Sequence, residues 1–277
     1  MKKIIIAALL CACTGAITAQ EKPKPAKDTL VIITTDTLNK DKRTKKSITI
    51  KFAMKDTVEN DTTKKDFKPS SKFSAQFTLA RIDLGLSTYL DNGSFTLSPA
   101  TPYLERETWK SSNFGLEVFQ MGYRFNSYFK VYVAAGLDWN HMRLTENVTF
   151  QKKLPVLTPV EQNIEFDKNR FSSQYLRLPL SFQLRSKDDQ KGNKVNFVFG
   201  PEVGFLLSGK IKQVSGERGK EKFKDDYNFA PFRYGGTVRV GWNSLAFFAK
   251  YYASDTFDST PQKGLKNMAF GLTFGLN

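Results

Sequence analysis

His141 is the only histidine in the sequence, and histidine is the most common general base in enzymes. A catalytic histidine needs a nucleophile, such as a serine hydroxyl, within hydrogen-bond reach. His141 shares strand parity with Trp139, so we expect it to lie in a girdle of aromatic side chains rather than to activate a nucleophile. We therefore predict no catalytic residues and a protein that is not an enzyme.

The sequence offers few residues that could bind a metal or a cofactor. Cys11 and Cys13 lie in an amino-terminal segment that we expect to be removed, which leaves one histidine and the carboxylates for a transition metal. No glycine-rich phosphate-binding loop occurs, and the glycines are instead scattered along the expected strands. The sequence therefore predicts no metal site and no cofactor.

Charged residues recur at similar heights on the expected strands and alternate in sign. The six that we assign to a structural charge belt are Asp83, Glu117, Asp138, Arg177, Glu202 and Arg233. Charges in a narrow, low-dielectric interior are costly unless they are paired, so we predict that Arg177 bridges Asp138 and Glu202. Further charge comes from Arg81, Arg239 and Lys250. We expect a plug that excludes water, with a gate or ligand site as the alternative.

The strands that must position these charges are indicated by a long alternation from Tyr175 to Arg185. Its even positions are apolar and its odd positions are polar, charged or proline. The alternation lasts about eleven residues, close to the length that lets a tilted strand cross a bilayer. Residues 131–140 and 267–277 show the same pattern. Since the second face is small or polar, the pattern predicts a barrel whose exterior faces lipid.

The chain after residue 73 contains eight candidate strands. They are 76–89, 113–125, 129–145, 172–186, 194–208, 229–242, 244–254 and 266–277. Long and short connections alternate between them, as in barrels with short periplasmic turns and long external loops. The predicted fold is all-β: an eight-stranded antiparallel up-and-down transmembrane barrel in the outer membrane, with both termini periplasmic.

Aromatic residues are expected to form two girdles at the membrane interfaces. Near the short turns lie Trp242, Tyr128, Phe129, Tyr123 and Phe125. Near the opposite rim lie Trp139, Tyr175, Phe232, Tyr234 and Tyr251.

The segment before the barrel divides into two parts. Residues 1–19 read as a secretory signal with two lysines, an apolar run and small residues, and acylation of Cys13 is the alternative to simple removal. Residues 20–72 form a low-complexity tail, rich in Lys, Thr, Asp and Pro, which we expect to be flexible and periplasmic. Residues 73–277 form the barrel.

The formal net charge of +15 raises the question of an anionic partner. No nucleic-acid recognition motif occurs, so we expect no nucleic-acid binding. Basic residues cluster in the expected loops, namely Lys152, Lys153, Arg218, Lys220, Lys222 and Lys224. They are suited to the phosphates of lipopolysaccharide, although a solvated loop explains them equally well.

Four runs of residues together resemble a known family. They are Gly136-Leu137-Asp138-Trp139-Asn140, Tyr175-Leu176-Arg177-Leu178-Pro179-Leu180, the run from Lys224 to Gly235, and Gly271-Leu272-Thr273-Phe274. The sequence resembles the PorT-like small outer-membrane β-barrel proteins of Bacteroidota over the signal and about residues 70–277. The resemblance implies a link to type IX secretion and gliding, and it carries over no catalytic residues.

Three functions follow as hypotheses. The first is a non-enzymatic barrel that acts as an accessory in envelope assembly or protein secretion and binds a periplasmic or secretion-machinery protein through residues 20–72. The second is a surface binding or adhesion barrel. The third is an outer-membrane lipid-modifying enzyme that uses His141. A soluble periplasmic β protein is a further alternative.

Overall fold

The computed structural model describes residues 32–34, 48–50, 72–187 and 193–275. The predicted signal segment, Cys13 and most of the predicted tail lie outside the described residues. Within residues 20–72, β1 (Ile32–Thr34) pairs with β2 (Ile48–Ile50) in a short antiparallel sheet. None of the described helices is long and apolar enough to cross a membrane.

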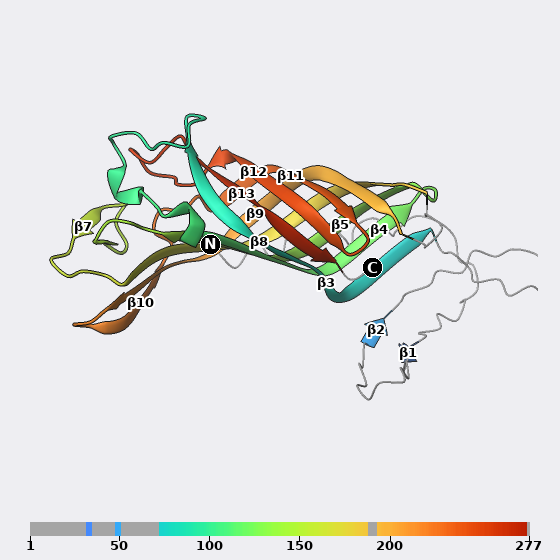
Figure 1. The fold of residues 1–277 in the computed structure, drawn as a ribbon, viewed down its shortest axis with the longest axis horizontal. Helices are drawn as coiled ribbons and strands as arrows, with labels where there is room; N and C mark the ends of the chain where they lie inside the picture. Colours follow the sequence, from blue (N-terminus) through green and yellow to red (C-terminus); the bar gives the residue numbers. More distant parts are fainter. Residues whose placement is uncertain (1–31, 35–47, 51–71, 188–192, 276–277) are drawn as a thin grey trace, which may run out of the picture. The chain divides into compact units, whose positions relative to one another are not determined.

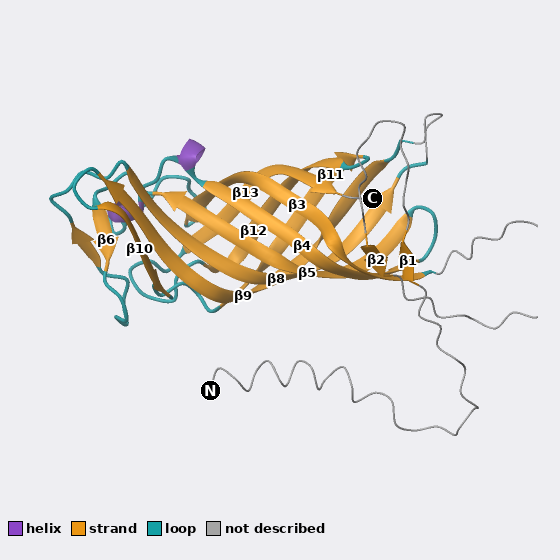
Figure 2. Ribbon diagram, turned by 90° about the horizontal axis from the view of Figure 1, so that it is seen from below, coloured by secondary structure: helices purple, strands orange, loops and turns teal. Residues whose placement is uncertain are grey.

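Eight of the described strands close into a ring. They are β3 (Phe73–Asp91), β4 (Ser112–Arg124), β5 (Phe129–Arg143), β8 (Lys168–Arg185), β9 (Val195–Ser215), β11 (Phe232–Trp242), β12 (Leu245–Asp255) and β13 (Leu265–Gly275). Each strand pairs antiparallel with its neighbours along the chain, and β13 pairs with β3 to close the ring. Figures 1 and 2 show the strands tilted around a barrel. The prediction of an all-β, antiparallel, up-and-down barrel is confirmed.

The alternation of β8 places its polar residues inside the barrel. Arg177 and Ser181 are 0% exposed, whereas Leu180 and Leu184 are 36% and 44% exposed. Large apolar side chains are exposed along the other strands as well, including Phe199 on β9, and a water-soluble barrel would bury them. The apolar exterior and polar interior are those of a barrel that faces lipid.

The two ends of the barrel differ in the length of their connections. At the short-turn end the connections are 125–128, 186–194 and the two-residue turn 243–244, where Asn243 has a φ of 52°. Asparagine tolerates this left-handed backbone, which a tight hairpin requires. At the long-loop end the connections are 92–111, 144–167, 216–231 and 256–264.

The long connections contain short elements of their own. These are the 3-10 turns η1 (Pro102–Leu104) and η2 (Thr108–Lys110), the strand pair β6 (Val148–Phe150) and β7 (Pro159–Glu161), and β10 (Gly219–Asp225). β10 pairs with the far half of β9, so the wall of the barrel continues past the ring as a hairpin. Figure 1 shows β7 and β10 at this end.

Several strand boundaries differ from those expected from sequence, among them the start of β8 at Lys168 rather than 172, and two of the differences have a clear backbone cause. β9 continues to Ser215 rather than ending at residue 208, because its last residues pair with β8 and β10. β11 begins at Phe232 rather than at Phe229. Tyr227 and Asn228 have positive φ values of 48° and 54°, which interrupt an extended strand before Phe229.

Candidate functional site

The lumen contains a network of charged side chains that we call the lumen plug. It consists of Arg81 and Asp83 on β3, Glu117 on β4, Asp138 on β5, Arg177 on β8, Glu202 on β9, Arg233 and Arg239 on β11, and Lys250 on β12. The structure places all six residues of the proposed charge belt inside the ring, and all six are buried. The additional cations Arg81, Arg239 and Lys250 join the same network.

Arg177 pairs differently from our expectation. Its Nη1 donates to Asp83 Oδ2 and its Nη2 donates to Glu117 Oε1, each at 2.8 Å. Its Nη1 lies 3.8 Å from Glu202 Oε2, which is an ion pair without a hydrogen bond. The predicted bridge is confirmed only for Glu202, as this longer ion pair, and among the described residues no ion pair or hydrogen bond joins Arg177 to Asp138. The hydrogen bonds of Arg177 reach across the lumen to β3 and β4.

The stagger of the strands explains this pairing. Arg177 lies directly opposite Gly136 on β5 and Gly204 on β9. Asp138 lies opposite Tyr175, and Glu202 lies opposite Pro179. Each is therefore two residues away from Arg177 along β8, in opposite directions. Strands in a closed barrel must be staggered in this way. With glycine on both sides, the guanidinium has space to extend into the lumen centre.

Asp138 is held by a second group of donors. Arg233 Nη2 donates to its Oδ2 at 2.6 Å, and Lys250 Nζ donates to its Oδ1 at 3.0 Å. Asn113 Nδ2 adds a third hydrogen bond at 3.0 Å. The carboxylate of Asp138 is thus satisfied from β4, β11 and β12, and these bonds link strands across the lumen.

Two tyrosines sandwich the guanidinium of Arg233. The guanidinium carbon lies 3.9 Å from the ring centroids of both Tyr175 and Tyr252, a geometry that favours a buried cation. Tyr252 also donates to Glu202 Oε1 at 2.5 Å. Tyr175 was expected in the aromatic girdle, but it faces the lumen and is buried. Its odd-numbered parity in β8 is the signal that could have placed it there.

Arg239 and Lys250 complete the plug. Arg239 Nη2 donates to Glu117 Oε1 at 2.8 Å and to Asp83 Oδ2 at 3.1 Å, and Lys250 Nζ lies 2.8 Å from Asp83 Oδ2. Each of the two carboxylates is therefore shared by several cations. Buried charges are tolerated only with such pairing, and the network links β3, β4, β8, β11 and β12 across the interior.

Close packing around the plug leaves little empty space. A Cβ atom on Gly204 would lie 2.8 Å from Arg233 Nε, so the glycine is needed for the arginine to fit. A cavity of about 10 Å³, lined in part by Asn140, Arg233 and Tyr252, is the space of about one water molecule. At the short-turn end, a cavity of about 40 Å³ lies beside Arg81 and Arg239.

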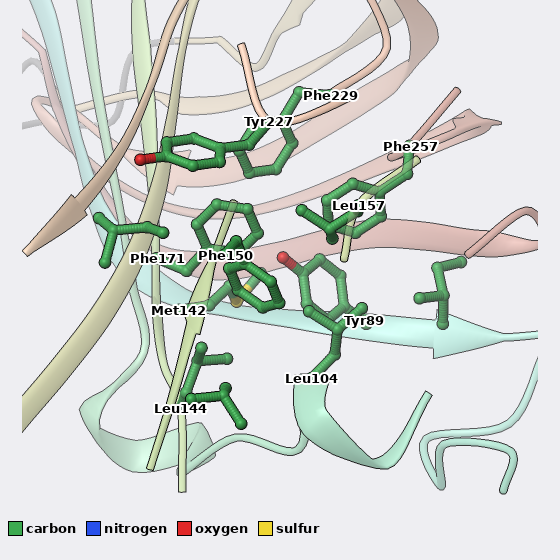
Figure 3. Packing of buried hydrophobic residues seen from close by; sticks show 13 residues of the cluster. Tyr89, Leu104, Met142, Leu144, Phe150, Leu157, Phe171, Tyr227, Phe229 and Phe257 are labelled. Atoms are coloured by element: carbon green, nitrogen blue, oxygen red, sulfur yellow. The ribbon is translucent and has the colours of Figure 1, made fainter. Parts of the chain in front are cut away.

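Apolar side chains close the barrel beyond the plug, at the long-loop end. This loop cap consists of Tyr89, Leu104, Met142, Leu144, Val148, Phe150, Leu157, Phe171, Ile211, Tyr227, Phe229, Phe257 and Leu265. All four long connections contribute to it, and Figure 3 shows the side chains gathered around Phe171. The Phe171 ring lies 4.7 Å from Phe229 and 4.8 Å from Phe150 between centroids. The loop cap was not predicted from the sequence.

Polar contacts tie the long connections to Tyr175 and to one another. Tyr175, which stacks on Arg233, donates from its hydroxyl to the backbone oxygen of Ala230 at 2.9 Å. Asn228 Nδ2 donates to the backbone oxygens of Leu154 and Pro155 at 3.1 and 3.0 Å, which ties two long connections together. The described residues thus close the lumen by an ionic layer and an apolar layer.

His141 lies on the outward face of β5, beside the partly exposed Trp139, as its parity predicted. Its Nδ1 lies 2.9 Å from Ser172 Oγ, which sequence spacing did not identify as a partner. No side chain among the described residues hydrogen-bonds the other ring nitrogen, so the orienting third group of a catalytic triad is absent there. In the same part of the chain, no group of three or more potential metal ligands occurs.

Comparison with known proteins gives a family, and two structures of one protein are among the solved structures that resemble this chain. Residues 43–277 match the family described as outer membrane protein beta-barrel domain. The crystal structure of Ail, the attachment invasion locus protein of Yersinia pestis, is 13% identical with a TM-score of 0.32, covering 73% of this chain and 95% of that chain. The structure of Ail with the heparin analogue sucrose octasulfate is 14% identical with a TM-score of 0.30, covering 73% and 96%. No curated protein sequence matches the chain.

Proposed function

Since this chain belongs to the outer membrane protein beta-barrel domain family, we propose that it is a closed, non-enzymatic barrel that serves as an accessory in envelope assembly or protein secretion. It contacts outer-membrane lipid through its apolar exterior. The short turns and both ends of the barrel domain face the periplasm, and the long loops face outward, as in other barrels with this pattern of connections.

The observation that carries this proposal is the doubly closed lumen. The carboxylates of Asp83 and Glu117 are fully buried and shared between Arg177 and Arg239, so bulk water does not reach them. An interior filled by side chains does not suit a diffusion pore. A barrel without a pore and without a complete catalytic triad in its described part acts through its surfaces and its tail.

The link to secretion is supported by resemblance. The run from Lys224 to Gly235 is the most specific part of the likeness to PorT-like proteins of Bacteroidota, and in this chain it supplies Tyr227 and Phe229 to the loop cap and Arg233 to the lumen plug. We place a secretion-machinery or other periplasmic partner on residues 20–72, which follow a removable signal at 1–19.

A surface binding barrel is the second candidate, and one observation favours it. The long connections are not bare turns: they contain β6, β7 and β10 and share one apolar core. Such an ordered external layer is a suitable platform for a ligand or a host surface, since binding residues commonly lie on loops held by a rigid scaffold.

Conductance measurements test the closed lumen. We expect the purified protein to give no stepwise conductance in a planar lipid bilayer, because the lumen plug and the loop cap fill the interior. A porin of known conductance, inserted under the same conditions, serves as the control. Stable, repeated conductance steps from the wild-type barrel would contradict the proposal.

Co-purification distinguishes the accessory from the surface binding barrel. We expect envelope proteins that crosslink to the full chain to be lost when residues 20–72 are deleted, and to be retained when β10 and its turn are replaced by a short loop. Folded gel mobility before boiling shows that both variants form barrels. If the crosslinked proteins are lost when β10 is replaced but are retained when residues 20–72 are deleted, the surface binding alternative is supported.

A further inference from the structure

Cations form rows on the outward face of the wall beyond Trp139, toward the long-loop end. Arg143 on β5 lies opposite Arg170 on β8, Arg170 lies opposite Lys212 on β9, and Lys212 lies opposite Lys222 on β10. Residues directly opposite on antiparallel strands point to the same face of a sheet. Four cationic side chains on four successive strands therefore stand side by side.

The neighbouring rows extend this pattern. One row consists of His141, Ser172, Lys210 and Lys224, and another contains Lys168 and Lys220 on either side of Val214. Together these rows form what we call the basic face: Arg143, Lys168, Arg170, Lys210, Lys212, Lys220, Lys222 and Lys224, with His141 and Ser172.

Carboxylates are directed away from the basic face. Along β10 the three lysines alternate with Glu221, Phe223 and Asp225, which therefore point to the opposite side of the sheet. Glu107 is the acid beside the face, and it lies 3.9 Å from Arg143 but 2.5 Å from Lys110. Among the described residues, none of the six lysines of the basic face has an ion-pair partner.

Rows of like charge are unfavourable by themselves. Like charges directly opposite each other on a sheet destabilise the pair, so a row of four cations favours binding of a compensating anion. The row spans three strand spacings, about 14 Å, and the three rows span about 13 Å along the strands. This area is larger than one phosphate, and it matches a head group that carries several phosphates.

The position of the basic face along the barrel axis shows which part of the membrane would surround a bound anion. Trp139 packs against Phe114 with ring centroids 5.3 Å apart on the lipid-facing wall. Counted from Trp139, the His141 row lies about 7 Å and the Arg143 row about 13 Å further along β5. An aromatic girdle marks the level of lipid head groups, so the basic rows begin where head groups begin.

We propose that the basic face binds the phosphates of a phosphorylated glycolipid of the lipopolysaccharide class, whose acyl chains lie on the apolar wall below Trp139. His141, whose Nδ1 lies 2.9 Å from the buried Ser172 hydroxyl, adds a polar ring to the middle row. The cations act as multiple charge-assisted donors to phosphate oxygens. This site rests on the proposed orientation, which places the basic face in the outer leaflet.

Binding of lipopolysaccharide to the purified full chain in nonionic detergent tests the site. The triple variant R170Q/K212Q/K222Q removes the centre of the basic face, and we expect it to weaken binding about a hundredfold, because each cation near an anionic lipid surface contributes a factor of about five. The matched control K72Q/K187Q/K263Q removes three exposed lysines elsewhere, and we expect a change within about threefold. Gel mobility before boiling shows that both variants are folded.

Three ligands separate a phosphorylated glycolipid from other anions. We expect lipopolysaccharide to bind, and the same lipopolysaccharide after phosphatase treatment to bind at least tenfold more weakly. Equal binding of phosphatidylglycerol at the same charge density would overturn the proposal, because the face would then be a general anionic surface. Equal losses in the triple variant and in its control would overturn it as well.

A cysteine at the β9–β10 turn tests the orientation separately. Glu217 is exposed there, so Glu217→Cys is expected to react with an impermeant thiol reagent on intact cells. If the purified protein binds lipopolysaccharide tightly but the cysteine is not labelled on intact cells, the orientation in the proposed function is overturned. The chemistry assigned to the basic face would remain supported.

Discussion

Replacing Arg177 with methionine is expected to lower the free energy of unfolding by about 3 to 5 kcal/mol, the usual result of removing one partner from a buried ion pair. Methionine keeps much of the packing volume but donates no hydrogen bonds to Asp83 and Glu117, which accept from Arg177 at 2.8 Å. Both carboxylates stay buried with fewer cations around them. Urea unfolding in detergent micelles, followed by gel mobility before boiling, measures the change.

A neutral partner should restore part of this loss. In a double-mutant cycle with Glu117→Gln, we expect a coupling energy of about 1 to 3 kcal/mol, whereas a cycle with Glu202→Gln should give about 0.5 kcal/mol or less. The difference follows from the 2.8 Å contact in the first pair and the 3.8 Å separation in the second. A larger coupling with Glu202 than with Glu117 would contradict the pairing in the lumen plug.

Phe171→Ala is expected to loosen the loop cap and to cost about 3 to 5 kcal/mol of stability, as large-to-small substitutions of buried phenylalanine do. Phe171 is fully buried, and its ring lies within 6.0 Å of Phe150, Tyr227, Phe229 and Phe257 between centroids. Since the long loops pack on this ring, their local unfolding should become easier while the barrel remains closed. Limited trypsin digestion should cleave residues 209–228 faster in the variant.

The control for this prediction is Phe247→Ala. Phe247 is 72% exposed on the lipid-facing side of β12 and belongs to neither the loop cap nor the lumen plug. Its loss should leave the rate of tryptic cleavage in the long loops unchanged. Equal cleavage rates for wild type and Phe171→Ala would show that the loops do not depend on the loop cap for their order.

The barrel wall could be predicted from sequence because its alternation is local. Apolar residues such as Leu180 and Leu184 occupy every second position, and the face opposite them carries Arg177 and Ser181, so strand, face and length all follow from the order of residues. The same parity assigned six charges to the lumen, and the structure places each of them there.

The partners of those charges could not be predicted, because they depend on stagger between strands. Arg177 and Asp138 have similar heights when residues are counted from the turns, but the register sets Arg177 opposite Gly136. A shift of one pleat is enough to direct the guanidinium to Asp83 on the far side of the lumen. Turn lengths alone do not determine that shift.

The loop cap escaped prediction for a related reason. Its members come from all four long connections and from five barrel strands and show no common period, so no window of sequence contains them. Phe229 was assigned to a strand on local pattern, although Tyr227 and Asn228 before it adopt positive φ. Contacts between distant segments, such as Phe229 with Phe257, form the core there.

The barrel wall is not equally high on all sides, and this affects how other membrane proteins can approach it. β9 is 21 residues long, whereas β11, β12 and β13 have 11 each. A barrel with a level rim presents the same height to neighbouring proteins on every side. In this barrel β8, β9 and β10 continue past the ring at the long-loop end, so the wall is taller there than along β11, β12 and β13. The tall side carries the basic face, so two copies that met there would bring like charges together, and an anionic neighbour suits it better than a second copy.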